Sequence, residues 1–203
     1  MRYTSLLLVL VCVIVFVVQM LVSGFTNMFL LDSSIIWQRP WTLITAVFLH
    51  GSPEHLVFNM FALALFGFIL ENIIGTKRFL IIFFAGGIIA GIGSIFFYSA
   101  SLGASGAIFA VIGMLAVIRY KMSVWVFGVP MPMAVAAGIW AIADIVGVFY
   151  PSDVANIAHL SGLVFGIVYG FYIKKWIKSE NKKERTKILS DKELEQWENE
   201  YLK

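Results

Sequence analysis

Long apolar runs, separated by segments that hold charged residues, glycine or proline, make up most of this 203-residue chain. An apolar helix of about 20 residues spans the hydrocarbon core of a bilayer. The fourth run is the shortest, so we expect it to lie inside a bundle, away from lipid. The pattern predicts an all-α, polytopic membrane bundle of six transmembrane helices, at about 4–23, 54–73, 78–99, 104–119, 132–150 and 156–173.

The charges that flank these runs predict the direction of the helices. Positive residues recur at every second boundary: at Arg2, at Lys77 and Arg78, at Arg119 and Lys121, and in the Lys-rich tail. The positive-inside rule then places both termini in the cytoplasm, and we expect a multi-pass protein of the plasma membrane. Val22-Ser23-Gly24 is also weakly compatible with cleavage of the first run as a signal peptide. Its apolar stretch of roughly 18 residues, however, exceeds the usual length of about 7–15.

Composition agrees with a membrane protein and excludes several functions. Hydrophobic residues make up 60% of the chain and charged residues 13%, where a soluble domain has about 25% charged residues. Nine of the fifteen Lys and Arg and seven of the twelve acids lie in 174–203. The net charge of +3 therefore belongs to a tail and does not indicate a nucleic-acid surface. The lone Cys12 excludes an internal disulfide and a cysteine-based metal site.

The chain divides into a membrane domain, 1–175, and a charged cytoplasmic tail, 176–203. Ser190 and Glu193 fit a capping box in this tail. Apolar residues then recur at helical spacing, at Leu194, Trp197 and Tyr201. We expect a short amphipathic helix from about 191, lying on the inner membrane surface. A frayed, solvated tail is the alternative.

Two polar side chains lie in apolar runs at similar depth. Ser105 is 14 residues from Arg119, about 21 Å of helix, and His159 is 15 residues from Lys174, about 22 Å. Both helices are predicted to cross in the same direction, so both side chains lie roughly 10 Å below the outer face. Each residue alone has an ordinary explanation, a serine bonded to a backbone carbonyl or a satisfied buried histidine. Their shared depth favours a nucleophile and its base.

Small residues would let these two helices approach each other. On the sixth helix, His159 begins a stripe of glycines, at Gly162, Gly166 and Gly170. The fourth helix offers a second stripe beside Ser105, at Gly106, Ala110 and Gly113. Such stripes allow close packing of membrane helices, with or without chemistry.

A second set of polar residues lies just before the second helix and in its first turns. His55 and Asn59 are four residues apart, so they share one helix face, and both side chains can donate to an oxyanion. A three-histidine metal site, formed by His50, His55 and His159, is the alternative. No acidic or cysteine ligand accompanies these histidines at a recognisable metal spacing.

Two acids lie within or beside the apolar runs. Asp144, in the fifth run, orients His159, or is a paired structural carboxylate, or lies at the outer aqueous edge. Glu71, near the end of the second run, is expected to pair with Lys77 or Arg78, or to cap a neighbouring helix.

These residues resemble three motifs of the rhomboid family of intramembrane serine proteases. Gly103-Ala104-Ser105-Gly106 resembles the family's Gly-x-Ser-Gly nucleophile motif. Ala158-His159, followed by Gly162 and Gly166, resembles the helix that bears its base. His50, His55 and Asn59 resemble the His-x4-His-x3-Asn motif of its second helix. The resemblance spans about 37–172, and the motifs stand in the family's order.

The resemblance implies that Ser105 is the nucleophile and His159 the general base. It implies that His55, Asn59 and the backbone N–H of Ser105 stabilise the oxyanion. It also implies hydrolysis of peptide bonds in or near transmembrane segments of other proteins, at a site open to the extracytoplasmic side, without metal or cofactor. Six residues would support this site: His50, Gly103, Gly106, Phe109, Gly162 and Gly166.

Two positions depart from the family's pattern. Trp41 is followed by Thr42 where many members have arginine, although Arg39 stands two residues earlier. Phe109 stands where many members have a tyrosine, so it can stack on the base but cannot form a hydrogen bond. Two other functions stay open. The first is an inactive relative that binds and retains membrane proteins, and the second is a small transporter, which the lack of an inverted repeat disfavours.

Overall fold

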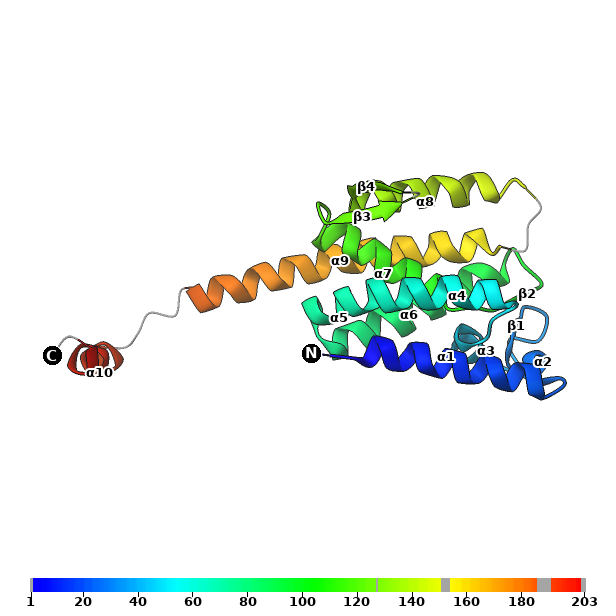
Figure 1. The fold of residues 1–203 in the computed structure, drawn as a ribbon, viewed down its shortest axis with the longest axis horizontal. Coiled ribbons are helices and arrows are strands. Elements are labelled where there is room, and N and C mark those ends of the chain that lie inside the picture. The colour runs from blue at the N-terminus through cyan, green and yellow to red at the C-terminus, as the bar shows by residue number, and fades with distance from the viewer. Residues whose placement is uncertain (1, 127, 151–153, 186–190, 202–203) are drawn as a thin grey trace. The chain divides into compact units, whose positions relative to one another are not determined.

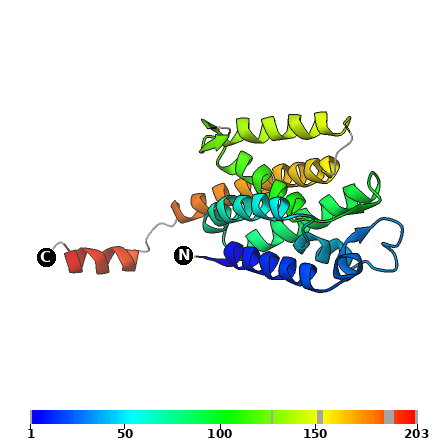
Figure 2. The same cartoon turned by 45° about the vertical axis from the view of Figure 1, so that its right-hand side comes forward.

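The computed structural model describes residues 2–126, 128–150, 154–185 and 191–201, which fall into two units. The first unit extends to Phe171 and is a bundle whose long helices run nearly along one axis (Figure 1). Figures 1 and 2 place α1 and α8 at opposite edges of this bundle. The long helices are α1 (Thr4–Leu21), α4 (Pro53–Ala62), α6 (Thr76–Ile95), α7 (Ser105–Ile118), α8 (Met133–Gly147) and α9 (Asn156–Arg185).

The second transmembrane helix is continuous but changes its winding. α4 passes through a π-helical turn, η2 (Leu63–Gly67), into α5 (Phe68–Ile74). Such turns insert one residue into the helix and are frequent at functional sites. Here the turn directs Leu65 and Phe66 toward the cavity described below.

Short elements connect α1 to α4 and α6 to α7. The first connection holds α2 (Phe25–Phe29), β1 (Leu31–Asp32), α3 (Thr42–Thr45) and the 3₁₀ helix η1 (Ala46–Phe48). The second holds β2 (Ala100–Ser101), which pairs antiparallel with β1. Leu31 lies opposite Ser101 and Asp32 opposite Ala100. This pairing ties together the loops that precede α4 and α7, the helices that carry His55, Asn59 and Ser105.

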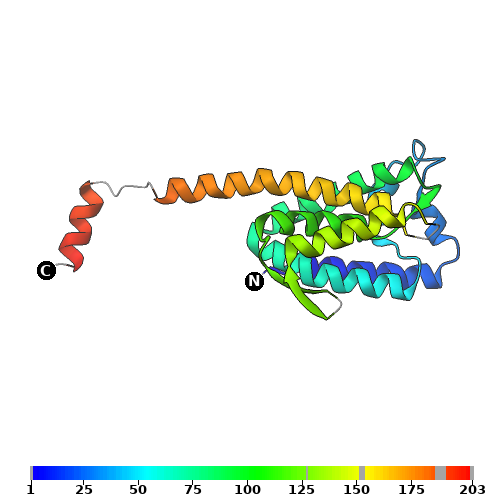
Figure 3. The ribbon, with the colours of Figure 1, turned by 90° about the horizontal axis from the view of Figure 1, so that it is seen from above.

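A β-hairpin leads into α8, as Figure 3 shows. β3 (Ser123–Val126) and β4 (Val129–Pro132) are antiparallel, with a turn that contains Gly128 at φ 79°. The sequence does not predict this hairpin, which is an addition to the helical bundle that it does predict. Proline lacks the backbone donor that a helix interior needs and is tolerated in edge strands, so Pro130 and Pro132 favour a hairpin before the helix begins.

α7 lies in the interior of the bundle. Ten of its 14 residues are buried, which confirms the expectation for the short fourth run. It packs against α6 where Gly86 meets Ala110 and Gly106 meets Ala90. A methyl group on either glycine would overlap the side chain opposite, so these positions set how closely α6 and α7 approach.

The chain is a multi-pass membrane protein. Four of the described helices are long and apolar enough to cross a bilayer: Thr4–Leu21, Pro53–Ile74, Thr76–Ile95 and Asn156–Ile177. α7 and α8 are apolar but shorter, with 14 and 15 residues. The lengths alone therefore support four of the six predicted spans.

The second unit, from Tyr172 onward, contains the end of α9 and α10 (Asp191–Tyr201). α10 occupies the stretch in which the sequence predicts a tail helix, and the rings of Trp197 and Tyr201 lie 5.7 Å apart on it. The predicted capping residue Ser190 lies outside the described residues. α9 continues to Arg185 and does not end near 173, because the residues that follow include many Lys, Glu and Arg, which are good helix formers.

Glu71 caps the N-terminus of α1. Its carboxylate accepts hydrogen bonds from the backbone N–H groups of Thr4 (3.2 Å) and Ser5 (2.9 Å). The hydroxyls of Ser5 (3.1 Å) and Thr76 (2.8 Å) also donate to it. The first N–H groups of a helix have no acceptor within the helix, and negative charge is stabilising there. Of the roles expected for Glu71, capping a neighbouring helix is observed.

We predict that Glu71→Ala lowers the free energy of unfolding by about 2–3 kcal/mol, because buried donors at the start of α1 lose a charged acceptor. Thermal unfolding in detergent micelles measures this loss. Asn72→Ala is the matched control, since it removes an exposed side chain that donates to the Phe68 carbonyl. Equal stability of the two variants would contradict the capping role.

Candidate active site

Ser105 is the first residue of α7 and follows a turn at Gly103. Gly103 has φ 122°, a conformation that residues with a side chain rarely adopt. Its N–H donates to the carbonyl of Ala46 at 2.9 Å, which holds the turn against η1. The amide of Ser105 lies in the first helical turn, so it has no acceptor within α7, and the helix dipole is positive there. This end of α7 suits a negatively charged oxygen.

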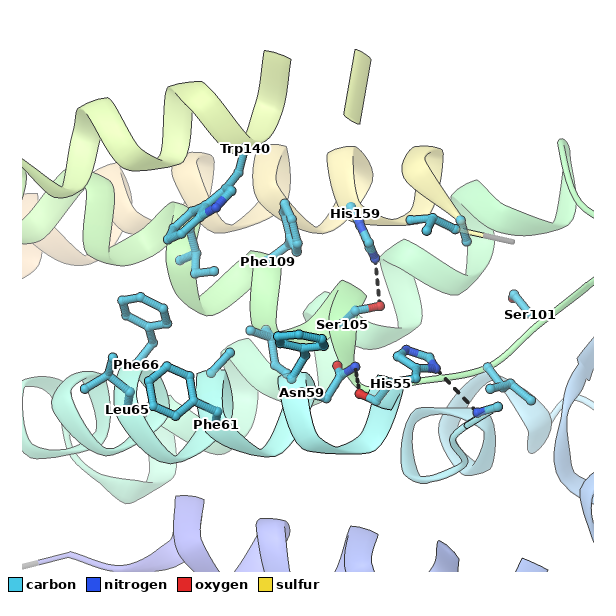
Figure 4. Close-up of a pocket in the computed structure, with 18 of the residues that line it drawn as sticks. His55, Asn59, Phe61, Leu65, Phe66, Ser101, Ser105, Phe109, Trp140 and His159 are labelled. Atoms are coloured by element: carbon cyan, nitrogen blue, oxygen red, sulfur yellow. Dashed lines mark hydrogen bonds between the residues drawn. The ribbon is translucent and has the colours of Figure 1, made fainter. Parts of the chain in front are cut away.

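His159 lies in the first turn of α9 and links two other helices. Its Nε2 is 2.8 Å from the Oγ of Ser105, and its Nδ1 is 3.0 Å from the Oδ1 of Asp144 on α8. Figure 4 shows the ring and the hydroxyl pointing toward one another from α9 and α7. A carboxylate accepts only, so Nδ1 carries the proton and Nε2 is left to accept from the Ser105 hydroxyl. This is the arrangement a nucleophile and its base require.

Phe109 fixes the plane of the imidazole. Its ring centroid is 4.4 Å from that of His159 and the two planes are inclined by 10°. Phe109 is one turn after Ser105 on α7, so the helix that carries the hydroxyl also carries the stacking ring. Stacking does not prevent rotation of the imidazole within its own plane. The hydrogen bonds of its two nitrogens fix that rotation.

α7 and α9 approach each other closely along their small residues. A methyl group on Gly162 would overlap the carbonyl oxygen of Gly106, and one on Gly166 would overlap the carbonyl oxygen of Ala110. On α7, a methyl group on Gly113 would overlap the carbonyl oxygen of Leu163. The backbones are thus in direct contact on both sides of the seam, which brings the hydroxyl within reach of the imidazole.

His55 approaches Ser105 from α4. Ser52 caps this helix by accepting from the backbone N–H of His55 at 3.2 Å. The His55 Nδ1 accepts from the backbone N–H of Gly51 at 3.4 Å, so the proton resides on Nε2. A side chain on Gly103 would place its Cβ 2.9 Å from this Nε2. A proton-bearing nitrogen therefore faces the turn that presents Ser105.

Asn59 follows His55 one turn later and is buried. Its amide nitrogen donates to the His55 carbonyl at 2.8 Å, and its Oδ1 has no partner among the described residues. Figure 4 shows Asn59 and His55 on the α4 side of Ser105. One N–H of this amide is used by the helix, which leaves the second available to a ligand.

His50 lies in the loop before α4, as expected, and is 1% exposed. The side chain of Gln19 on α1 holds its backbone, accepting from its N–H at 3.0 Å and donating to its carbonyl at 3.2 Å. Its ring meets that of His55 edge-on at 5.2 Å. Burial, and in second place neighbouring His55, lowers the pKa of His50 to about 4, so the ring is neutral.

The alternative of a three-histidine metal site finds no support in this geometry. Within the part of the chain that the structure describes, no group of three or more His, Cys, Asp or Glu is placed to hold a metal ion. His159 instead uses both ring nitrogens for Ser105 and Asp144.

A cavity of about 1180 Å³ opens beside Ser105 and His159. Its walls come from α4 and η2 on one side, α7 at the back, and Trp140 of α8 with the strand β3 on the other. The lining is predominantly apolar, and polar side chains gather at the end that holds Ser105 and His159 (Figure 4). An apolar cavity with a polar end fits a hydrophobic ligand that has one polar bond, placed at that end.

The sequence leaves open whether Asp144 orients His159 or has a structural role. In the structure its Oδ1 lies 3.0 Å from the Nδ1 of His159. The available signal was its position as the one acid of the fifth run. The rotation of α8 that aims it at His159 has no signature in the sequence.

A family model of the Rhomboid domain matches residues 37–176, more than half of the chain. The chain belongs to the rhomboid family. The matched range contains all the residues that resemble the family's motifs, including Ser105, His159, His55 and Asn59. In this rhomboid, residues from all three motifs lie near the Ser105 hydroxyl (Figure 4).

Three curated relatives are similar to this rhomboid. RHOMBOID-like protein 6, mitochondrial, of Arabidopsis thaliana is 34% identical over 135 residues, which cover 66% of this chain and 43% of that protein. Rhomboid protease GlpG of Haemophilus influenzae is 26% identical over 177 residues, covering 84% and 91%. Rhomboid protease GluP of Bacillus subtilis is 35% identical over 140 residues, covering 66% and 26%. The chain thus spans less than half the length of two of these relatives and most of the third.

We predict that Gly103→Ala lowers activity by about 10²-fold or more, because its methyl group would displace the ring of His55 and the turn before Ser105. The rate of labelling by a serine-directed fluorophosphonate measures the effect. Gly138→Ala on α8 is the control, since a methyl group there meets nothing within 4 Å. Similar rates for the two variants would show that Gly103 does not shape the site.

Proposed function

We propose that this rhomboid is an intramembrane serine protease in which Ser105 is the nucleophile and His159 the general base. The observation that carries the proposal is the 2.8 Å contact between Ser105 Oγ and His159 Nε2 within a bundle of membrane helices. Membership of the rhomboid family, and relatives that are named rhomboid proteases, support it.

The reaction proceeds in two halves. His159 takes the proton of the Ser105 hydroxyl as Oγ attacks the carbonyl carbon of the scissile bond. The C–N bond then breaks, the imidazolium gives its proton to the leaving amine, and an acyl-enzyme remains. A water molecule attacks the acyl group while His159 takes its proton, which releases the carboxyl product and restores Ser105. This chemistry needs no metal or cofactor.

The developing oxyanion would lie in front of the N-terminus of α7. The amide of Ser105, the Nε2–H of His55 and the free N–H of Asn59 are the donors we assign to it. Donors of this kind act most strongly when they are fixed before the reaction. The bonds of His55 to Gly51 and of Asn59 to the His55 carbonyl support that role, because they hold both side chains in place.

The proposed substrates are transmembrane segments of other membrane proteins. The apolar lining of the cavity supports such a ligand, and we expect it to enter sideways from the bilayer, between α4 and α8. The backbone of a helix in lipid is satisfied internally, so the segment must unwind before its scissile bond can reach Ser105. Gly or Pro in the substrate would lower that cost.

We further propose that all six apolar helices cross the plasma membrane, with both termini in the cytoplasm. Ser105 and His159 each stand at the beginning of a helix, so they share one end of the bundle. Positive residues lie toward the opposite ends of these helices, at Arg119 and Lys174. The positive-inside rule then makes the site face the extracytoplasmic side, which supplies water.

An inactive binding protein or a small transporter explains the site less well. Neither function requires a serine hydroxyl in hydrogen-bond contact with an imidazole whose other nitrogen faces a carboxylate. A protease requires such a contact, and this chain keeps both of its members.

Reconstituted wild-type protein should cleave a single-span membrane substrate and react with a fluorophosphonate, whereas Ser105→Ala and His159→Ala should do neither above background. Ser161→Ala is a matched control, because this serine of α9 faces Gly93 of α6. Labelling that persists in Ser105→Ala would reject Ser105 as the nucleophile. An unreactive wild-type protein would favour a binding or transport function.

Removal of one oxyanion donor should impair the enzyme without abolishing it. We expect His55→Ala and Asn59→Ala each to lower kcat by about 10²–10³-fold, since one fixed donor is lost from the transition state. Single-turnover cleavage measures this, and Asn72→Ala controls for loss of an amide elsewhere on the same helix. A fully active His55→Ala protein would exclude its oxyanion role.

A further inference from the structure

Asp144 lies behind the imidazole of His159, on the side away from Ser105. Its Oδ1 is 3.0 Å from Nδ1, while Nε2 of the same ring faces the serine hydroxyl. Asp144 is 6% exposed and is not among the described residues that line the cavity. The carboxylate therefore contacts His159, and it contacts neither the Ser105 hydroxyl nor the cavity.

We propose that Asp144 is a positioning residue for the general base, His159. The proposal rests on the proposed function. An ionised carboxylate accepts from Nδ1–H, which keeps the lone pair of Nε2 directed at the Ser105 hydroxyl. The same charge stabilises the imidazolium that forms when His159 takes the serine proton.

The hydrogen-bond partners of Asp144 differ from those of Glu71, which stabilises the fold by capping α1. Glu71, the buried carboxylate that caps α1, accepts from two amides and two hydroxyls, so both of its oxygens are satisfied. Asp144 accepts from the His159 ring at Oδ1, and its Oδ2 is buried without a partner among the described residues. A buried charge with one partner stabilises a fold poorly. The burial of Asp144 is therefore explained by its contact with the imidazole of His159.

The seam between α8 and α9 holds the carboxylate in place. One turn after Asp144, a methyl group on Gly147 would lie 2.7–2.9 Å from the side chain of Asn156 at the start of α9. Asn156 is itself buried and donates to the Val154 carbonyl at 3.2 Å. Close packing at Gly147 therefore sets the distance from Asp144 to His159.

Few titratable groups surround the base. Asp144 faces it from α8 and His55 from α4, while α7 contributes the Ser105 hydroxyl and the ring of Phe109. The described lining of the cavity contains no Lys, Arg, Asp or Glu. Among the described residues, Asp144 is thus the acidic group that faces His159.

The pH dependence of fluorophosphonate labelling tests the proposal on the full chain in liposomes. In this reaction Ser105 Oγ bonds to phosphorus, fluoride leaves, and His159 takes the serine proton. We expect Asp144→Asn to lower the plateau rate by about 10- to 100-fold, the worth of one hydrogen bond to a charged group. We also expect its acid limb to move about 1–3 pH units toward acid, because the imidazolium loses an adjacent opposite charge.

Two variants separate positioning from packing. Asp144→Glu keeps the charge, so its acid limb should stay near that of the wild type even if the rate falls. Asn156→Ala loosens the same seam without touching the ring, so it should leave the pH profile in place. An Asp144→Asn protein with the wild-type rate and profile would overturn the proposal. So would an Asp144→Glu protein whose acid limb moves a full unit toward acid.

The outcomes also distinguish this proposal from the proposed function. If the wild type is labelled and Ser105→Ala is not, the protease chemistry stands whatever Asp144 does. If the wild type is not labelled at any pH, both proposals fail together.

Discussion

The direct contact between the backbones of α7 and α9 is the constraint on which the site depends. Lipid provides little hydrophobic drive for helix association, so packing of small residues has to hold the pair together. At Gly162 and Gly166 the backbone of α9 lies against carbonyl oxygens of α7. Any larger side chain there would move the helices apart and carry the His159 ring out of reach of the Ser105 hydroxyl. One seam thus provides both helix packing and the hydrogen bond.

Other polar groups of the site are also held by close packing against their neighbours. His55 sits against the turn at Gly103, where a methyl group would overlap its ring. Phe109 stacks on His159 from the helix that carries the nucleophile. The two carboxylates that are buried in the described part of the chain differ in their partners, since Glu71 has four donors and Asp144 has the imidazole. Apolar surroundings make each of these few polar contacts strong, so a small number of them can define the site.

Much of the fold could be predicted because length and hydropathy are local properties. The bounds of α7 and α8 fall within a few residues of the predicted runs, and α7 lies inside the bundle, as its short run predicts. The β3–β4 hairpin escaped prediction because four-residue strands carry little pattern beside an apolar helix. Hydropathy does not predict the full length of α9, because a helix can continue past the membrane without any change in its backbone.

The sequence by itself determined which polar groups enter the apolar runs, at what depth, and beside which small residues. That was enough to pair Ser105 with His159, because rise per residue converts spacing into depth. Only the tertiary structure decided that Asp144 meets Nδ1, that Glu71 caps α1, and that the His55 ring faces Gly103. Those contacts depend on how each helix is rotated about its axis and how closely it packs against its neighbours. Rotation and packing are set by the whole bundle and not by any one segment.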